Sequence, residues 1–165
     1  MPKYAAFLRG VMPGNVTMAA LKRRFEKAGF TGVRTVLGSG NVVFTARAAP
    51  SDAKVTKAAG MAAFVRSIDH LAKLAAGDPF AKLRGLDPKA KRVVTFLRKR
   101  PARLKLPLAL GGARILAVQE SEAFSAYLPG PEGPVFMTLI GQTFGDDVTT
   151  RTWQTVTKVV SAALA

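Results

Sequence analysis

The chain has 165 residues, no cysteine, a single histidine and a formal net charge of +15 at pH 7. Without cysteine it has no disulfide, thiolate nucleophile, zinc ribbon or iron–sulfur cluster, and His70 alone does not make a nitrogen-rich metal site. A hydrophobic fraction of 48% predicts a folded chain, and the longest stretch without a charged residue, 133–145, is too short to span a bilayer. Lys3 and Arg9 leave no room for the apolar core of a secretory signal, so we expect a cytoplasmic protein without a cofactor.

Apolar periodicity and turn residues predict the elements of the first half. The helix after Thr17 has apolar residues at helical spacing and ends at Gly29, and the tripeptide at 38–40 forms the turn of a hairpin. Periodicity is weak between 46 and 60, where the helix is the least defined. The expected order is a strand at 3–9, a helix at 18–28, strands at 33–37 and 41–45, a helix within 46–60, a strand at 61–66 and a helix at 68–77 capped by Ser67.

The second half begins after a segment with two Asp-Pro dipeptides, which predict a linker over 78–90. Pro101 and Pro107 allow at most a short helix in the basic stretch after the next strand. Pro134 suits the first turn of a helix, and Thr149 or Thr150 suits the cap of the last one. The expected order is a strand at 92–97, a hairpin of strands at 113–118 and 123–128, a helix from 134 and a helix at 150–164 with Trp153 on its buried stripe.

The order of strands and helices is similar in the two halves and is typical of the split-βαβ motif. We therefore expect an α+β fold of two ferredoxin-like (split βαβ) subdomains packed together. Residues 1–77 form the first subdomain with a trailing helix, 78–90 form the linker, and 91–165 form the second subdomain with the C-terminal helix.

Three local strings occur in order along the chain: Leu8-Arg9-Gly10 with Asn15-Val16, then Ser39-Gly40-Asn41-Val42-Val43-Phe44, then the Thr149–Val156 string TTRTWQTV. In this order and spacing they resemble the bacterial domain of unknown function 1697 family. The resemblance implies an α+β fold of two related subdomains and assigns no activity. The chain departs from the family at Gly38, Thr152 and Gln154, where the family usually has Gln, Asn and Asn.

A ligand site is predicted at one edge of the first sheet. In a split-βαβ unit the first two strands run parallel with the third between them, so the loop after the first strand meets the hairpin turn. Backbone N–H groups of the helix capped by Thr17, an arginine fork and glycines suit a small phosphate- or carboxylate-bearing ligand. The candidates are Arg9, Gly10, Asn15, Ser39 and Asn41.

These residues also have a structural interpretation. The glycines can make turns, and Ser39 and Asn41 can satisfy the hairpin backbone. Arg9 can pair with Asp146, Asp147 or the C-terminal carboxylate. Arg151 is a sixth ligand-binding candidate. An arginine in the first turn of a helix is unfavourable beside the positive end of the helix dipole, which indicates that it has a partner. The alternative is that the residues of this string only cap the helix and pack in the core.

Residues 82–105 hold ten basic residues and one acid, Asp87, a local net charge of +9. Such a patch binds polyanions through counterion release, so nonspecific nucleic acid is one predicted partner, and a solvated basic surface is the alternative. The strand at 40–44 lacks the paired aromatics that sequence-specific RNA recognition uses. The patch consists of Lys82, Arg84, Lys89, Lys91, Arg92, Arg98, Lys99, Arg100, Arg103 and Lys105.

Catalytic groups are sparse in the sequence. His70 has structural neighbours, and Glu120 and Glu122 are interpreted as charge partners of 98–100. We therefore expect first a module that binds a small anion or nonspecific nucleic acid. A transferase-like, phosphate-handling enzyme is the second expectation, because phosphoryl chemistry relies mainly on placement and positive charge, and a protein-interaction adaptor is the third.

Overall fold

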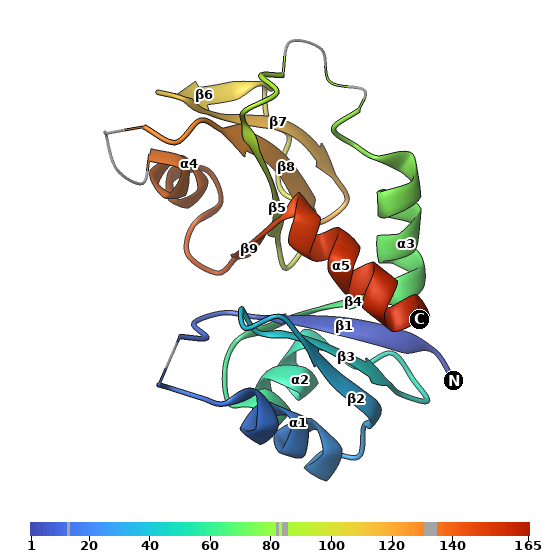
Figure 1. Ribbon diagram of the computed structural model, residues 1–165. Helices are drawn as coiled ribbons and strands as arrows, with labels where there is room; N and C mark the ends of the chain where they lie inside the picture. The colour runs from blue at the N-terminus through green and yellow to red at the C-terminus, as the bar shows by residue number, and fades with distance from the viewer. Residues whose placement is uncertain (13, 82, 84–85, 131–134) are drawn as a thin grey trace. The chain divides into compact units, whose positions relative to one another are not determined.

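The computed structural model describes residues 1–12, 14–81, 83, 86–130 and 135–165 (Figure 1). Within these residues the chain forms two antiparallel sheets and five helices, so the predicted α+β class is confirmed. The chain divides into two compact units: Met1–Gly77 with Thr155–Ala165, and Asp78–Gln154. None of the described helices is long and apolar enough to cross a membrane.

The first unit has a four-stranded sheet in the order β2-β3-β1-β4, in which β1 pairs antiparallel with both β3 and β4. Because β2 also pairs antiparallel with β3, β1 and β2 run parallel on either side of β3. The elements are β1 (Lys3–Leu8), α1 (Met18–Lys27), β2 (Thr31–Val36), β3 (Asn41–Thr45), α2 (Asp52–Ala59), β4 (Ala63–Ser67) and α3 (Ile68–Gly77).

Local capping explains where the helices of this unit begin. The Thr17 side chain accepts a hydrogen bond from the Ala20 backbone nitrogen at 3.0 Å, as predicted for an N-cap. Ser51 caps α2 in the same way through the nitrogen of Lys54, which places a defined helix in the segment with weak periodicity. Ser67 likewise accepts from the backbone nitrogen of His70 at the start of α3.

Helices α1 and α2 cover one face of the first sheet. Their buried residues Leu21, Phe25 and Val55 join β1 and β3 residues in one hydrophobic cluster. Phe44 of β3 lies inside this cluster with no exposed surface. The last turn of α5 (Trp153–Leu164) is bonded to the strands of the same unit, because Lys3 Nζ donates to the carbonyl oxygen of Ala163 at 2.6 Å.

The second unit has a five-stranded sheet in the order β6-β7-β8-β5-β9. The partial order β7-β8-β5-β9 repeats the order β2-β3-β1-β4 of the first sheet, strand for strand along the chain. No helix is present between β5 and β7, where the described residues form the short edge strand β6 instead. The elements are β5 (Lys91–Phe96), β6 (Leu108–Leu110), β7 (Ala113–Gln119), β8 (Glu122–Tyr127), α4 (Val135–Phe144) and β9 (Thr149–Thr152).

The two faces of the second sheet are covered differently. On one face α4 packs through Phe136, Leu139 and Ile140, and the Phe136 ring stacks on Tyr127 with 4.9 Å between centroids. Phe80, from the segment before β5, contacts Phe124 on the other face edge-on at 5.8 Å. The predicted linker 78–90 therefore also supplies a buried side chain to the second unit.

One expectation for the second half is wrong. The predicted last helix over 150–164 begins only at Trp153, because Thr149–Thr152 forms β9 and pairs with β5. Threonine is favoured in strands, and this pairing overrides its capping tendency. In addition, Thr155–Ala165 belongs to the first unit, whereas the sequence analysis placed the C-terminal helix in the second subdomain. Pro134, the predicted start of α4, lies outside the described residues.

Candidate functional site

The loop after β1 and the turn between β2 and β3 lie together at one end of the first sheet. The backbone nitrogen of Leu8 donates to the carbonyl oxygen of Gly40 at 2.9 Å. Gly40 has a φ of 85°, and a Cβ there would lie 2.5 Å from Cγ2 of Val11, so only glycine fits this contact. The predicted approach of loop and turn is therefore present.

The polar candidates at this end bond mainly to their own loops. Asn15 donates to the Gly10 carbonyl oxygen at 2.7 Å and accepts from the Met12 nitrogen at 3.1 Å. Asn41 is fully buried and donates to the Val36 carbonyl oxygen and to Oγ of Ser39, both at 2.9 Å. These bonds match the structural interpretation of Ser39 and Asn41 as residues that satisfy the hairpin backbone, and Asn15 closes its own loop in a similar way.

Arg9, Gly10, Asn15 and Ser39 are exposed at this end, and Asn41 is the buried candidate. Across the residues that the model places, the Arg9 guanidinium has no hydrogen-bond or ion-pair partner, while its backbone nitrogen donates to Ala62 at 2.9 Å. Leu8 packs into the cluster that contains α1, and Arg9 lies in a bend directly after β1.

Arg151 lies in β9 and not in the first turn of a helix, so the dipole argument made for it is wrong. Its Nη1 donates to Oγ1 of Thr149 and to the carbonyl oxygen of Thr150, both at 2.8 Å. Burial lowers the pKa of Arg151 from 12.5 to about 10, because desolvation disfavours the charged form. The guanidinium remains protonated at pH 7 and belongs to the second unit, whereas the other five ligand candidates belong to the first.

Glu122, which the sequence suggested as a charge partner of 98–100, is buried, and this burial was not predicted. It is fully buried at the start of β8, and Oε2 accepts from Oγ of Ser121 at 3.0 Å. Register places its side chain on the same sheet face as Arg151, because Phe96 of β5 is opposite both Glu122 and Thr149. A strand alternation pattern alone does not reveal this burial, because the residue begins its strand.

The acids expected near the basic stretch have other positions. Glu122 is buried, and Asp147 instead forms a two-bond ion pair with Arg98, with Nε to Oδ2 and Nη2 to Oδ1 both at 3.0 Å. Asp146 and Asp147 precede β9, which separates them from α5.

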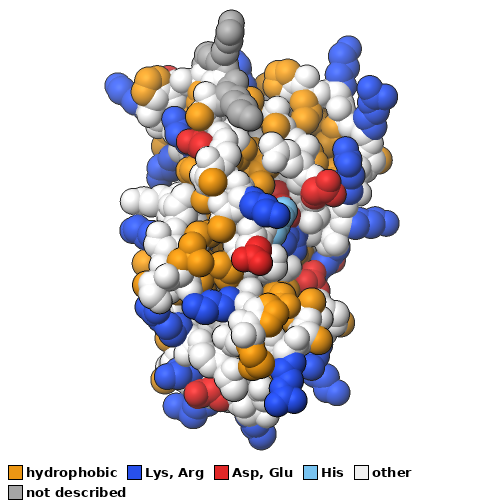
Figure 2. Space-filling view, turned by 90° about the vertical axis from the view of Figure 1, so that its right-hand side faces the viewer, with side chains coloured by type: hydrophobic (Ala, Val, Ile, Leu, Met, Phe, Trp, Pro, Cys, Tyr) orange, Lys and Arg blue, Asp and Glu red, His pale blue; other side chains and the backbone are white. Residues whose placement is uncertain are grey.

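The predicted basic patch is exposed wherever the structure describes it. Lys82 and Arg84 lie outside the described residues, and Arg92 stands over the Phe80 ring, 5.9 Å from its centroid. Lysine and arginine side chains are also spread over the face drawn in Figure 2, where acidic side chains are fewer. The exposed patch residues are Lys89, Lys91, Arg92, Arg98, Lys99, Arg100, Arg103 and Lys105.

The part of the patch between β5 and β6 has the most defined geometry. Five basic residues and no acid occur between 98 and 105, a segment named here the basic loop. A hollow of about 290 Å³ is lined by Arg98 and Lys99, and a second of about 150 Å³ is lined by Arg100 and Arg103. Pro101 lines both hollows, so the two adjoin along the loop.

In the described part of the chain no group of three or more His, Asp or Glu residues could hold a metal ion. His70 is half-buried on α3, and its backbone nitrogen bonds to Oγ of Ser67. The basic loop is therefore the strongest candidate functional surface.

Comparison with known proteins agrees with the fold. The model of a family described as a protein of unknown function, DUF1697, matches residues 1–109. A solved structure of SP0830, a conserved bacterial protein from Streptococcus pneumoniae, is similar with a TM-score of 0.67 at 17% identity. The similarity covers 100% of this chain and 99% of that chain. No curated protein matches.

Proposed function

We propose that this chain, which belongs to the DUF1697 family of proteins of unknown function, binds nucleic acid without sequence specificity through its basic loop. The proposal rests on the five cations between 98 and 105, a segment without an acid, four of which line two adjoining hollows. Regularly spaced phosphates are the ligand that such a row of fixed positive charges suits best. A cytoplasmic location, which the sequence predicts, agrees with this partner.

Most cations of the basic loop have no partner among the described residues, which favours the binding of an external anion. Arg98 is paired with Asp147, but Lys99, Arg100, Arg103 and Lys105 have no hydrogen-bond or ion-pair partner among the residues placed by the model. Each of these four side chains can therefore meet a phosphate without first breaking an internal bond. The apolar walls of the second hollow, including Leu104 and Val118, suit contact with sugar carbons beside the phosphates.

Sequence-independent contact is favoured over base recognition. The basic loop itself contains no aromatic residue on which bases could stack, and the strand at 41–45 carries a single aromatic, Phe44, which is buried. Lysine and arginine contacts to phosphates position a protein on a duplex and carry no sequence information. We therefore expect similar affinities for duplexes of unrelated sequence.

The expected salt dependence follows from the four unpaired cations. Each phosphate neutralised on duplex DNA contributes about −0.9 to the slope of log K against log salt, so four predict a slope of about −3.6. Affinity should then fall about 150-fold between 50 and 200 mM salt. Fluorescence polarisation with two 20-base-pair duplexes of unrelated sequence measures this, and absence of binding at 50 mM salt would refute the proposal.

A small anionic ligand at Arg9 is the second candidate. It is favoured by an exposed guanidinium without a partner in the described residues, next to Gly10 with a φ of 85°. Asn15, Ser39 and Asn41 are engaged in the bonds of their loops, so fewer donors remain there than the sequence predicted. Neither the transferase-like enzyme nor the adaptor is favoured by a specific contact.

We also propose that both units are variants of the ferredoxin-like split-βαβ arrangement, with a boundary at residue 77. The shared order of four strands in each sheet supports this proposal. The second unit differs by having β6 in place of the first crossover helix. Two related subdomains give the chain two separate surfaces, and the basic loop belongs to the second.

A further inference from the structure

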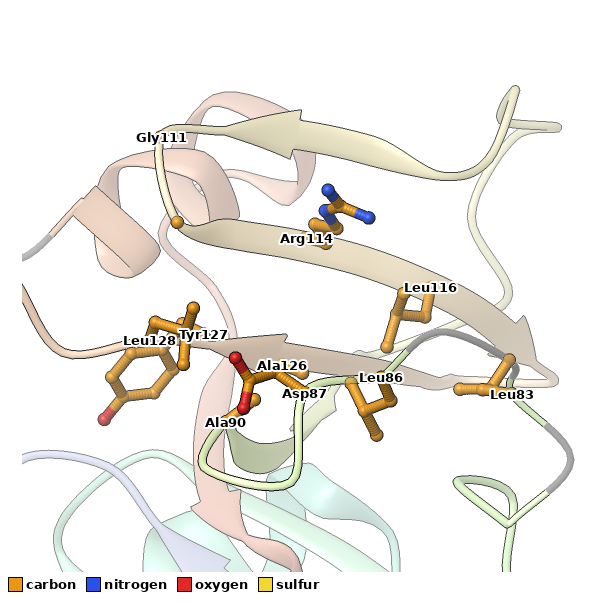
Figure 3. A pocket seen from close by; sticks show the side chains of 11 residues that line it. Leu83, Leu86, Asp87, Ala90, Gly111, Arg114, Leu116, Ala126, Tyr127 and Leu128 are labelled. Atoms are coloured by element: carbon orange, nitrogen blue, oxygen red, sulfur yellow. The ribbon is translucent and has the colours of Figure 1, made fainter.

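A separate cavity lies on the second sheet, away from the basic loop in sequence. It has a volume of about 430 Å³, within the range of ligand pockets, which is about 300–1,000 Å³. Strands β7 and β8 supply its floor, and the segment before β5 supplies the facing wall (Figure 3). All its lining residues belong to the second unit.

The body of this cavity is apolar. Leu86 comes from the facing wall and Leu116 from the β7 floor, and the two lie next to each other in Figure 3. Ala126, which is buried, and Leu128, which is 42% exposed, extend the apolar surface along β8. Such walls favour a ligand with an aliphatic or aromatic body, since contact with it removes apolar surface from water.

Two opposite charges line the same cavity and do not pair with each other. The Arg114 guanidinium on β7 has no hydrogen bond or ion pair to any described residue. Asp87 accepts a bond from the Lys89 backbone nitrogen through Oδ1 at 2.8 Å, and no ion pair joins it to a described residue. The cavity therefore presents a fork of five N–H donors and a carboxylate, each available to a ligand.

We propose that this cavity binds a small zwitterion with an apolar body, such as an apolar amino acid or a short apolar peptide. The ligand carboxylate pairs with Arg114, the ammonium group pairs with Asp87, and the body lies between Leu86 and Leu116. A purely anionic ligand would face the Asp87 carboxylate, and a purely cationic one would face Arg114. An uncharged ligand would cover both charges without bonding to either, which is unfavourable.

This site is independent of the proposed nucleic-acid function. The basic loop and the cavity share no lining residue, so a failure of either proposal leaves the other in place. The two possible ligands differ in the spacing of their charges. In an amino acid the ammonium and carboxylate groups are attached to the same carbon atom, whereas in a peptide at least one peptide bond lies between them.

Isothermal titration calorimetry with the whole chain tests the proposal. The probes are L-leucine and the dipeptide Leu-Leu, together with leucinamide, which lacks the carboxylate, and 4-methylpentanoate, which lacks the ammonium group. We expect one of the two zwitterions to bind with a Kd below about 1 mM. Both single-charge analogues should bind at least about tenfold more weakly, because each loses one charge-assisted bond.

Variants of the two charged residues assign the site. Arg114→Gln and Asp87→Asn should each weaken the zwitterion about tenfold, while Lys22→Gln, an exposed residue of α1, should leave the Kd unchanged. If a variant fails to fold, the analogue series on the wild-type chain still decides. The proposal would be overturned by no binding of either zwitterion at about 10 mM, by single-charge analogues that bind as tightly as the zwitterion, or by wild-type affinity in both variants.

Discussion

Replacing Phe44 with alanine is expected to lower the free energy of unfolding by about 4 kcal/mol. Phe44 is fully buried in β3, and its ring contacts three other aromatic rings: Phe30 at 4.6 Å, Phe25 at 5.4 Å and Tyr4 at 5.9 Å between centroids. Alanine removes the apolar area, leaves a cavity between sheet and helices, and ends all three ring contacts.

Urea unfolding followed by circular dichroism measures this loss. Phe44→Leu is the conservative comparison and should cost about 1–2 kcal/mol, because most of the volume is kept. Met137→Ala is the matched control, since Met137 is 49% exposed and its truncation should change stability by less than about 0.5 kcal/mol. A loss below about 1 kcal/mol for Phe44→Ala would mean that the first core does not have this packing.

The second large effect is expected at Arg151, where Arg151→Met should lower the free energy of unfolding by about 3 kcal/mol. Arg151 and Glu122 are buried on one face of the second sheet, on strands separated by β5, about 10 Å apart between backbones. The Arg151 side chain bonds to Thr149, which is level with Glu122 across β5. Its removal leaves a buried carboxylate without that positive charge.

A double-mutant cycle separates this electrostatic effect from lost packing. We expect Arg151→Met together with Glu122→Gln to cost at least about 1 kcal/mol less than the sum of the single variants. Additive losses would contradict a coupling between the two charges.

The pKa of Arg151 sets the pH range for this cycle. Because it falls from 12.5 to about 10 on folding, the residue is charged in both states at pH 7. Only above about pH 9 does the unfolded chain bind the proton more strongly, so the contribution of this group to stability rises with pH there. Measurements at pH 7 therefore report the charged form.

Most elements of the first unit could be predicted because local signals agree with the tertiary structure. The strand expected at 3–9 is Lys3–Leu8, and the helix expected at 18–28 is Met18–Lys27. Thr17 and Gly29 mark the ends of that helix through a cap bond and a φ of 96°. In such segments periodicity, capping and turn chemistry all favour the same structure.

Elements that depend on pairing with a distant strand could not be predicted in this way. The Thr149–Thr152 string has both capping and strand tendencies, and only its pairing with β5 decides between them. The edge strand β6 consists of three residues between Pro107 and a turn, too short for an alternating pattern. The burial of Glu122 likewise depends on its cross-strand neighbours.

The candidate surfaces were predictable to different degrees. The density of charge in the basic loop is a property of consecutive residues and is visible in the sequence. The cavity on the second sheet combines Asp87 with Arg114, which are distant along the chain and meet only because the segment before β5 covers β7 and β8. The roles of Asn15 and Asn41 depend on their hydrogen bonds, which cannot be predicted from the residue type alone.

The most direct test of nucleic-acid binding compares two triple variants with the same loss of charge. Lys99→Gln/Arg100→Gln/Arg103→Gln removes three cations of the basic loop, and Lys22→Gln/Arg23→Gln/Lys27→Gln removes three exposed cations of α1. The loop variant should bind duplex DNA at least about 30-fold more weakly at 100 mM salt, with a salt slope smaller by about 2.7, whereas the α1 variant should change affinity by less than about threefold. Equal losses in the two variants would show that net charge alone attracts DNA and would contradict a binding surface at the basic loop.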